Sequence, residues 1–125
     1  LSAVTQMEHS DYDGALQTLN AVVRRYPDFA EGWNRRATLF WMMERYADSI
    51  RDCQKVLELK PEHFGAWQGL AMCQMHLGDL EGAIFSFQRA VRLQPHDENT
   101  TTLLRRCERL LKMMPAHPRV PVDQA

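Results

Sequence analysis

The sequence predicts an all-α solenoid in which short helices pair as antiparallel hairpins and the hairpins stack side by side. The first observation is self-similarity, because Pro27, Pro61 and Pro95 recur at intervals of 34 residues, as do Trp33 and Trp67. The second is the helical period of about 3.6 residues in the apolar positions between these markers. The third is that no stretch shows the alternation expected of a strand. A repeat of this length marks a unit that buries its apolar face only against its neighbours.

Composition and charge argue against nucleic acid and membranes as binding partners. Of the 125 residues, 45% are hydrophobic and 25% are charged, and the formal net charge is −1. This balance argues against nucleic acid as a partner, since a nucleic-acid-binding chain needs a basic surface. No apolar run approaches the roughly 20 residues that span a bilayer, so we expect no membrane insertion.

The three cysteines indicate a reducing compartment. Cys53, Cys73 and Cys107 form no CxxC motif and are odd in number, which favours free thiols over disulfides. We therefore expect a soluble intracellular protein, in the cytoplasm or in an organelle matrix or stroma. Because the chain begins at Leu1 inside an expected helix, we also expect it to be part of a longer protein.

The N-terminal region is expected to contain the end of one helix, over residues 1–9, and a second helix that ends before Pro27. Ser10 and Asp13 have the spacing of a capping box, which would start the second helix. Pro27 would end it, because proline disfavours helical geometry in the preceding residue. Asp28 is a candidate N-cap for the next helix. The apolar face of the second helix consists of Ala15, Leu16, Leu19, Val22 and Val23.

Two similar hairpins and a closing helix follow. Helices are expected over about residues 31–43 and 46–59, then from Phe64 and from Leu80 on either side of a Gly78–Asp79 turn. Pro61 and Pro95 end the second helix of each hairpin. A last helix, over about residues 98–113, is expected to be capped by Asp97. We expect five bulky residues in the core: Trp33, Tyr46, Phe64, Trp67 and Phe87.

The pattern resembles the tetratricopeptide repeat family, whose motif of 34 residues has a large residue at position 4, small residues at 8 and 20, and proline at 32. Residues 30–63 and 64–97 match it as two full repeats, through Trp33, Ala37, Ser49 and Pro61 and then Trp67, Ala71, Ala83 and Pro95. Residues 1–29 supply a partial repeat and residues 98–114 a capping helix. The resemblance implies a right-handed superhelix over residues 1–114. Residues 115–125, which contain three prolines, are expected to be extended or disordered.

Two residues depart from the family pattern. Arg36 stands at position 7, where the family usually has leucine, and Cys53 replaces an aromatic residue at position 24. We interpret both as local repacking that leaves the fold intact.

The resemblance also implies where a partner binds, because the first helices of successive repeats line a concave groove in this family. Apolar Met and Trp side chains in such a groove adapt to a peptide or helix of a partner protein. We therefore hypothesise an adaptor or assembly scaffold. For the Met and Trp residues the alternative is packing against neighbouring helices, and for the two arginines it is a solvated surface. Carried onto this chain, the groove residues are Asn34, Thr38, Trp41, Met42, Gln68, Met72, Met75, His76, Arg106 and Arg109.

The sequence leaves two alternative functions open. The family's carboxylate clamp uses Lys and Asn to hold the acidic tail of a chaperone, but Thr38 and Met72 occupy clamp positions here and no Lys is present there. A structural role is the other alternative, either as a segment of a longer solenoid or through self-association. Otherwise we expect a monomer.

Catalysis and metal binding are not expected. The five histidines show neither an HExxH motif nor zinc-site spacing. Cys53 is expected on a core face, and Cys73 and Cys107 are expected to be half buried at most, without an activating base. We therefore expect no enzyme activity and assign no catalytic, cofactor-binding or metal-binding residue.

Overall fold

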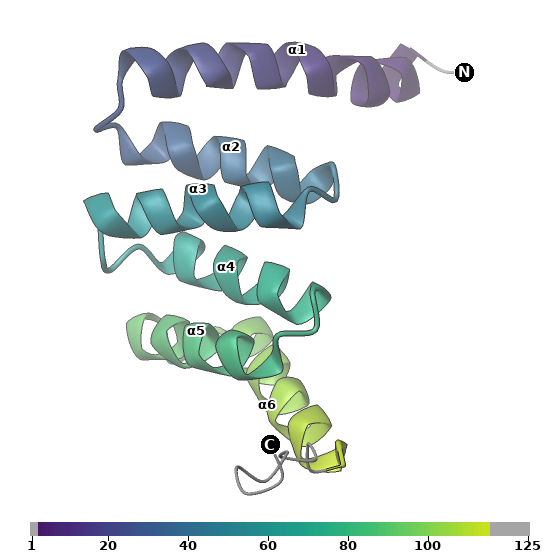
Figure 1. Ribbon diagram of the computed structural model, residues 1–125, viewed down its shortest axis with the longest axis vertical. Helices are drawn as coiled ribbons and strands as arrows, with labels where there is room; N and C mark the ends of the chain where they lie inside the picture. Colours follow the sequence, from purple (N-terminus) through teal and green to yellow (C-terminus); the bar gives the residue numbers. More distant parts are fainter. Residues whose placement is uncertain (1–2, 116–125) are drawn as a thin grey trace, which may run out of the picture.

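The computed structural model describes residues 3–115 and shows α-helices that follow one another along a single stack (Figure 1). The first helix, α1, lies at one end of the stack and the last, α6, at the other. No strand occurs within residues 3–115, which confirms the predicted all-α solenoid. The described helices are α1 (Ala3–Arg25), α2 (Ala30–Met42), α3 (Tyr46–Leu59), α4 (Phe64–His76), α5 (Leu80–Leu93) and α6 (Glu98–Met113).

Small residues hold the two helices of each hairpin close together. In the α2–α3 hairpin Ala37 and Ser49 are both buried, and the Ser49 hydroxyl donates a hydrogen bond to the Ala37 carbonyl at 2.8 Å. The α4–α5 hairpin has Ala71 and Ala83 at the equivalent positions, and both are fully buried. A larger side chain at these positions would force the helices apart, because protein interiors are close-packed.

The recurring tryptophans and prolines interact directly. The Trp33 indole nitrogen donates to the Pro27 carbonyl at 2.8 Å, and Trp67 donates to Pro61 at the same distance. This bond ties the loop before each hairpin to the first helix, and it satisfies the polar edge of a half-buried ring. The 34-residue recurrence of proline and tryptophan in the sequence therefore corresponds to a hydrogen bond that recurs in each full repeat.

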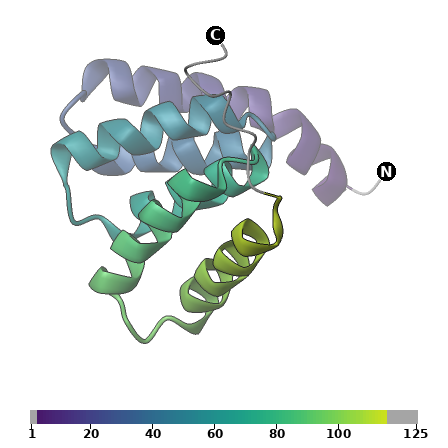
Figure 2. The same cartoon turned by 60° about the horizontal axis from the view of Figure 1, so that its bottom comes forward.

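The closing helix completes the core at the C-terminal end. Figure 2 shows α6 lying alongside α5. Phe87 is fully buried there in a cluster with Ala71, Ala83 and Cys107. Of the other bulky residues expected in the core, Trp33, Tyr46, Phe64 and Trp67 are half-buried.

The expected helix boundary at Ser10 is wrong, because α1 runs without a break from Ala3 to Arg25. At the equivalent positions of the two full repeats, Glu44 and Gly78 adopt positive φ and end the first helix of each hairpin. A separate helix before Ser10 would have only about two turns. Continuing the helix keeps the backbone hydrogen bonds through Ser10, and this outweighs the small apolar area that so short a helix could bury.

Helix capping differs in part from the expectation. Asp97 is confirmed as a cap, since its side chain accepts a hydrogen bond from the Thr100 amide at 3.1 Å. Asp28 is not the cap of α2, because that helix begins one residue later, after Phe29, and has no side-chain cap. His63 is an unexpected cap, in which Nδ1 accepts from the Ala66 amide at 3.0 Å.

Two further expectations concern the C-terminal tail and membrane insertion. The tail expected at 115–125 falls, beyond Pro115, outside the described residues. None of the described helices is long and apolar enough to cross a membrane.

Arg36, which departs from the family pattern, joins three helices. Its guanidinium contacts both carboxylate oxygens of Asp52 on α3, at 2.7 and 2.8 Å, and Asn20 on α1 at 2.9 Å. It also lies over the rings of Trp33 and Phe40, at 5.1 and 5.4 Å from their centroids. Hydrogen bonding to Asp52 raises the pKa of Arg36. Asp52 is almost fully buried, so removing Arg36 would leave a buried carboxylate without its partner.

We predict that Arg36→Leu lowers the free energy of unfolding by about 3 kcal/mol, because it leaves the Asp52 carboxylate buried and unpaired. Urea unfolding followed by tryptophan fluorescence measures the loss. The double variant Arg36→Leu/Asp52→Ala should regain most of it, since no buried charge remains. Equal stability of wild type and Arg36→Leu would show that the ion pair does not support the stack.

Candidate functional site

A hollow of about 260 Å³ lies between α2, α3 and α4. The first helices of the two full repeats, α2 and α4, provide most of its lining residues. Helix α3 contributes Ser49 and Cys53. Five of the residues assigned to the groove from the sequence lie together here: Asn34, Thr38, Trp41, Gln68 and Met72.

The floor of the hollow was not recognised from the sequence. It includes Gly69 and Cys53, together with the small residues Ala37, Ser49 and Gly65. A Cβ atom added to Gly69 would lie 3.4 Å from the Cys53 sulfur, so the missing side chain keeps the space above this sulfur open. A difference between the repeats could have indicated this floor, since the preceding repeat has Arg35 at the position of Gly69.

Two side-chain amides of the wall are held by hydrogen bonds. Asn34 Nδ2 donates to Glu31 at 3.2 Å, and Gln68 Nε2 donates to the Thr100 hydroxyl of α6 at 3.1 Å. Within residues 11–115, no hydrogen bond occupies the amide oxygen of either side chain. The wall therefore offers two fixed acceptors beside an otherwise apolar space.

Aromatic rings from three helices meet at one end of the hollow. Trp41 of α2 makes edge contacts with Tyr46 of α3 and His76 of α4, with ring centroids 5.3 and 4.9 Å apart. Tyr46 and His76 stack on each other at 4.9 Å. These contacts fix the Trp41 ring, which is half-buried, and they bring two of the sequence-assigned residues together.

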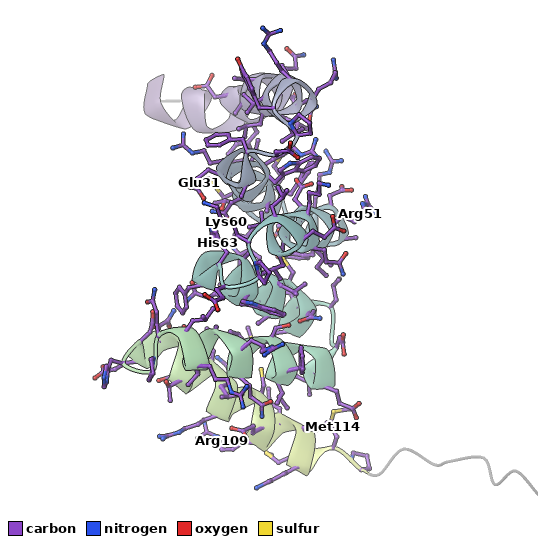
Figure 3. All side chains as sticks on the ribbon, turned by 90° about the vertical axis from the view of Figure 1, so that its left-hand side faces the viewer. Glu31, Arg51, Lys60, His63, Arg109 and Met114 are labelled. Atoms are coloured by element: carbon purple, nitrogen blue, oxygen red, sulfur yellow. The ribbon has the colours of Figure 1, made fainter. Side chains whose placement is uncertain are left out.

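The other sequence-assigned residues do not line the hollow. Met42 is 52% exposed, and Met75 packs against the cluster around Phe87. Arg106 and Arg109 are exposed on α6, and Figure 3 places Arg109 towards the end of the stack opposite α1. The predicted groove residues therefore come together only in the section between α2 and α4.

The charge next to the hollow is acidic. No Lys or Arg is among the lining residues. The carboxylate of Glu31 contacts the wall, since its Oε1 accepts from Asn34 and lies 3.2 Å from Nε2 of His63 (Figure 3). A carboxylate entering this section would meet like charge without a cation to hold it.

The cysteines are more deeply buried than the sequence suggested. The expectation that Cys73 and Cys107 are half buried at most is wrong, because both are fully buried. Cys73 is on α4, and Cys107 is on the face of α6 that packs against Ala71, Ala83 and Phe87. One repeat viewed alone does not reveal this packing. Burial raises the pKa of the Cys53 thiol to about 12 and also raises the pKa values of Cys73 and Cys107. A protonated, enclosed thiol is a poor nucleophile.

No cluster of three or more potential metal ligands occurs in the part of the chain that the structure describes.

Comparison with known proteins gives matches over most of the chain. Two family models described as tetratricopeptide repeat match it, one over residues 40–107 and the other over residues 2–62. A TPR repeat-containing protein of Rhizobium etli is 35% identical over 91 residues, which cover 73% of this chain and 45% of that protein. Human serine/threonine-protein phosphatase 5 is 22% identical over 102 residues, which cover 82% of this chain and 20% of the phosphatase. The chain thus spans less than half the length of these relatives.

Solved structures share the fold. The first TPR of Spaghetti (RPAP3), bound to the HSP90 peptide SRMEEVD, superposes with a TM-score of 0.80 at 20% identity, covering 86% of both chains. MamA gives a TM-score of 0.80 at 18% identity, covering 86% of this chain and 63% of its own. The TPR2B domain of yeast Sti1, in a complex with pHsp70, gives 0.73 at 20% identity, covering 85% of this chain and 90% of its own.

We predict that stability falls as the pH rises from about 9 towards 12, because the unfolded state loses the Cys53 proton near the ordinary thiol value of about 8.5 while the folded state retains it. For this thiol alone the slope is about 1.4 kcal/mol per pH unit. Urea unfolding at pH 9 and 10 measures it. Cys53→Ala should show a shallower slope, and parallel slopes for the two proteins would contradict the buried, protonated thiol.

Proposed function

Because the chain belongs to the tetratricopeptide repeat family, we propose that it is a protein–protein interaction module whose hollow between α2 and α4 receives an apolar side chain of a partner. The observation that carries this proposal is the convergence of Trp41, Met72 and Thr38 on one hollow beside two fixed amide acceptors. The ligand is a peptide in extended form or one face of a helix. The module has no catalytic step and no cofactor of its own.

The size of the hollow supports a side chain as its occupant. Its volume of about 260 Å³ is below the range of about 300–1,000 Å³ typical of small-molecule sites. Indole and thioether walls suit aliphatic side chains, and the polarizable Met72 can adapt to more than one of them. Burying one such side chain contributes about 1.5–3 kcal/mol.

The amide oxygens of Asn34 and Gln68 suit the backbone of the ligand. An extended peptide carries N–H groups that need acceptors when it leaves water. The two amides donate their own hydrogens to Glu31 and Thr100, so their oxygens are oriented before the ligand arrives. Such preorganisation reduces the entropy lost on binding.

The charge around the hollow argues against binding of an acidic chaperone tail. Two of the structural neighbours are described with HSP90 or pHsp70 ligands, but no cation lines the hollow of this chain and Glu31 lies beside it. The groove therefore favours an apolar anchor without a carboxylate next to it.

The structural alternative is favoured by one observation. Met113 is 80% exposed, and Leu110 and Met114 are also exposed, so the outer face of α6 is more apolar than that of a typical terminal helix in a repeat protein. A self-associating segment would cover these residues, and a concentration-dependent mass in light scattering would support this alternative.

We predict that Thr38→Glu weakens binding of a peptide selected from a random phage-display library by at least about tenfold, because it places a carboxylate in the apolar hollow. Thr38 is exposed, so the fold should persist. Fluorescence anisotropy measures the affinity. The control is Gln54→Glu, which adds the same charge at an exposed position on α3 outside the hollow. Equal losses for both variants, or none for Thr38→Glu, would place the site elsewhere.

We predict that the peptide SRMEEVD does not displace a groove-bound peptide, because its terminal carboxylates find no cation in the hollow. A competition assay by fluorescence anisotropy checks this, with an unlabelled copy of the selected peptide as the positive control. Displacement by SRMEEVD would establish the chaperone-tail alternative.

A further inference from the structure

An exposed basic and aromatic surface lies on α5, away from the hollow between α2 and α4. It consists of Phe85, Arg89 and Arg92 together with Trp67 of α4, and is called the α5 patch below. Phe85 is 55% exposed, although it is a large apolar side chain. None of these residues lines the hollow between α2 and α4.

The equivalent surface of the preceding repeat has a different composition. Thirty-four residues before Phe85 and Arg92 stand Arg51 and Glu58. On α3 both residues are in ion pairs, Arg51 with Asp48, and Glu58 with Lys55 at 3.4 Å. On α5 the acid is replaced by Arg92 and the exposed Arg by Phe85. Within the described part of the chain, the outer surface of α5 therefore lacks the ion pairs that neutralise charge on α3, and it carries an additional apolar side chain.

The arginines of the α5 patch have no carboxylate partner among the described residues. No ion pair within residues 11–115 includes Arg89 or Arg92. The Arg89 guanidinium instead lies 5.5 Å from the ring centroid of Trp67 and 5.6 Å from that of Phe85. Stacking on rings holds a guanidinium in place while its N–H edge can still bond a carboxylate with two hydrogen bonds.

Two hollows flank these arginines. Arg89 and Arg92 contribute to a hollow of about 510 Å³ that Phe85, Gln88, Val91 and Leu104 also line. The same two arginines contribute to a second hollow of about 310 Å³, lined as well by Pro61, Glu62, Trp67 and Leu93. Positive charge therefore lies directly between two partly apolar depressions.

We propose that the α5 patch is a second docking surface and that its occupant is an acidic, leucine-containing segment of a partner protein. A carboxylate of the segment bonds the guanidinium groups of Arg89 and Arg92. A neighbouring aliphatic side chain enters the hollow beside Phe85 and Leu104. This surface is independent of the groove, so a partner could occupy both or two partners one each.

The same observations disfavour a nucleic acid as the occupant. The Trp67 and Phe85 rings are in edge contact, with centroids 6.1 Å apart, and Arg89 lies over both. They are therefore not open platforms on which bases could stack. Glu62 lines the second hollow, where a continuous phosphate backbone would meet its charge, whereas a single carboxylate between Arg89 and Arg92 avoids it.

The test uses a fluorescein-labelled synthetic peptide in which glutamates alternate with leucines, and measures its binding by fluorescence anisotropy. We expect Arg92→Gln to weaken binding by about tenfold or more, the effect of losing a charged hydrogen bond. Phe85→Ser should weaken it as well. Arg51→Gln, which removes the same charge from the outer surface of the neighbouring repeat, should leave the affinity unchanged. Thr38→Glu in the groove should also leave it unchanged.

Several results would overturn the proposal. They are absence of peptide binding, an equal loss with Arg51→Gln, and equal binding of a peptide with glutamine in place of glutamate. Binding of polyuridylate that depends on Arg92 and Phe85, with no binding of the acidic peptide, would assign the surface to nucleic acid. A dimer in light scattering that Arg92→Gln dissociates would make a second copy of the chain the occupant. Because Thr38→Glu tests the groove separately, failure of one proposal does not imply failure of the other.

Discussion

Paired helices lie close together at Ala37 and Ser49, and again at Ala71 and Ala83, and the stacking of the hairpins follows from this close contact. Only small residues allow two helices to lie this near, and the hydrogen bond from Ser49 to the Ala37 carbonyl fixes one such contact. Each hairpin is then a thin unit that buries its remaining apolar face only by stacking. The stacking places α2 beside α4 and so creates the hollow whose floor includes Ala37 and Ser49.

Residues that differ between the repeats divide into two groups. Arg36 and Asp52 stand where the next repeat has Leu70 and Ser86. The ion pair and the apolar residue are two solutions to the same packing problem, and both leave the helices in place. Phe85 and Arg92, by contrast, replace Arg51 and Glu58 on the outer surface, where no packing requires them. Differences of the second kind are the better guide to binding.

How far the sequence predicted the structure depended on whether local chemistry decided the outcome. The bounds of α3 and α6 were predictable because prolines, turn residues and the Asp97 cap act within a few residues. One wall of the hollow was also predictable, since the resemblance to the tetratricopeptide repeat family assigns Thr38 and Trp41 to the inner face of the first helix, and both line the hollow. The continuous α1 and the floor at Gly69 were not predictable, because they depend on how much area a neighbouring helix offers and on packing across hairpins.

The proposal that partners bind between α2 and α4 is tested most directly by the indole N–H signals of the three tryptophans in a two-dimensional nitrogen–proton NMR spectrum. Trp41 lines the hollow, whereas Trp33 and Trp67 donate their indole hydrogens to proline carbonyls in the loops. On titration with a library-selected peptide, we expect the Trp41 signal to shift while those of Trp33 and Trp67 stay in place. A saturable complex that leaves the Trp41 signal unmoved would show that partners bind elsewhere.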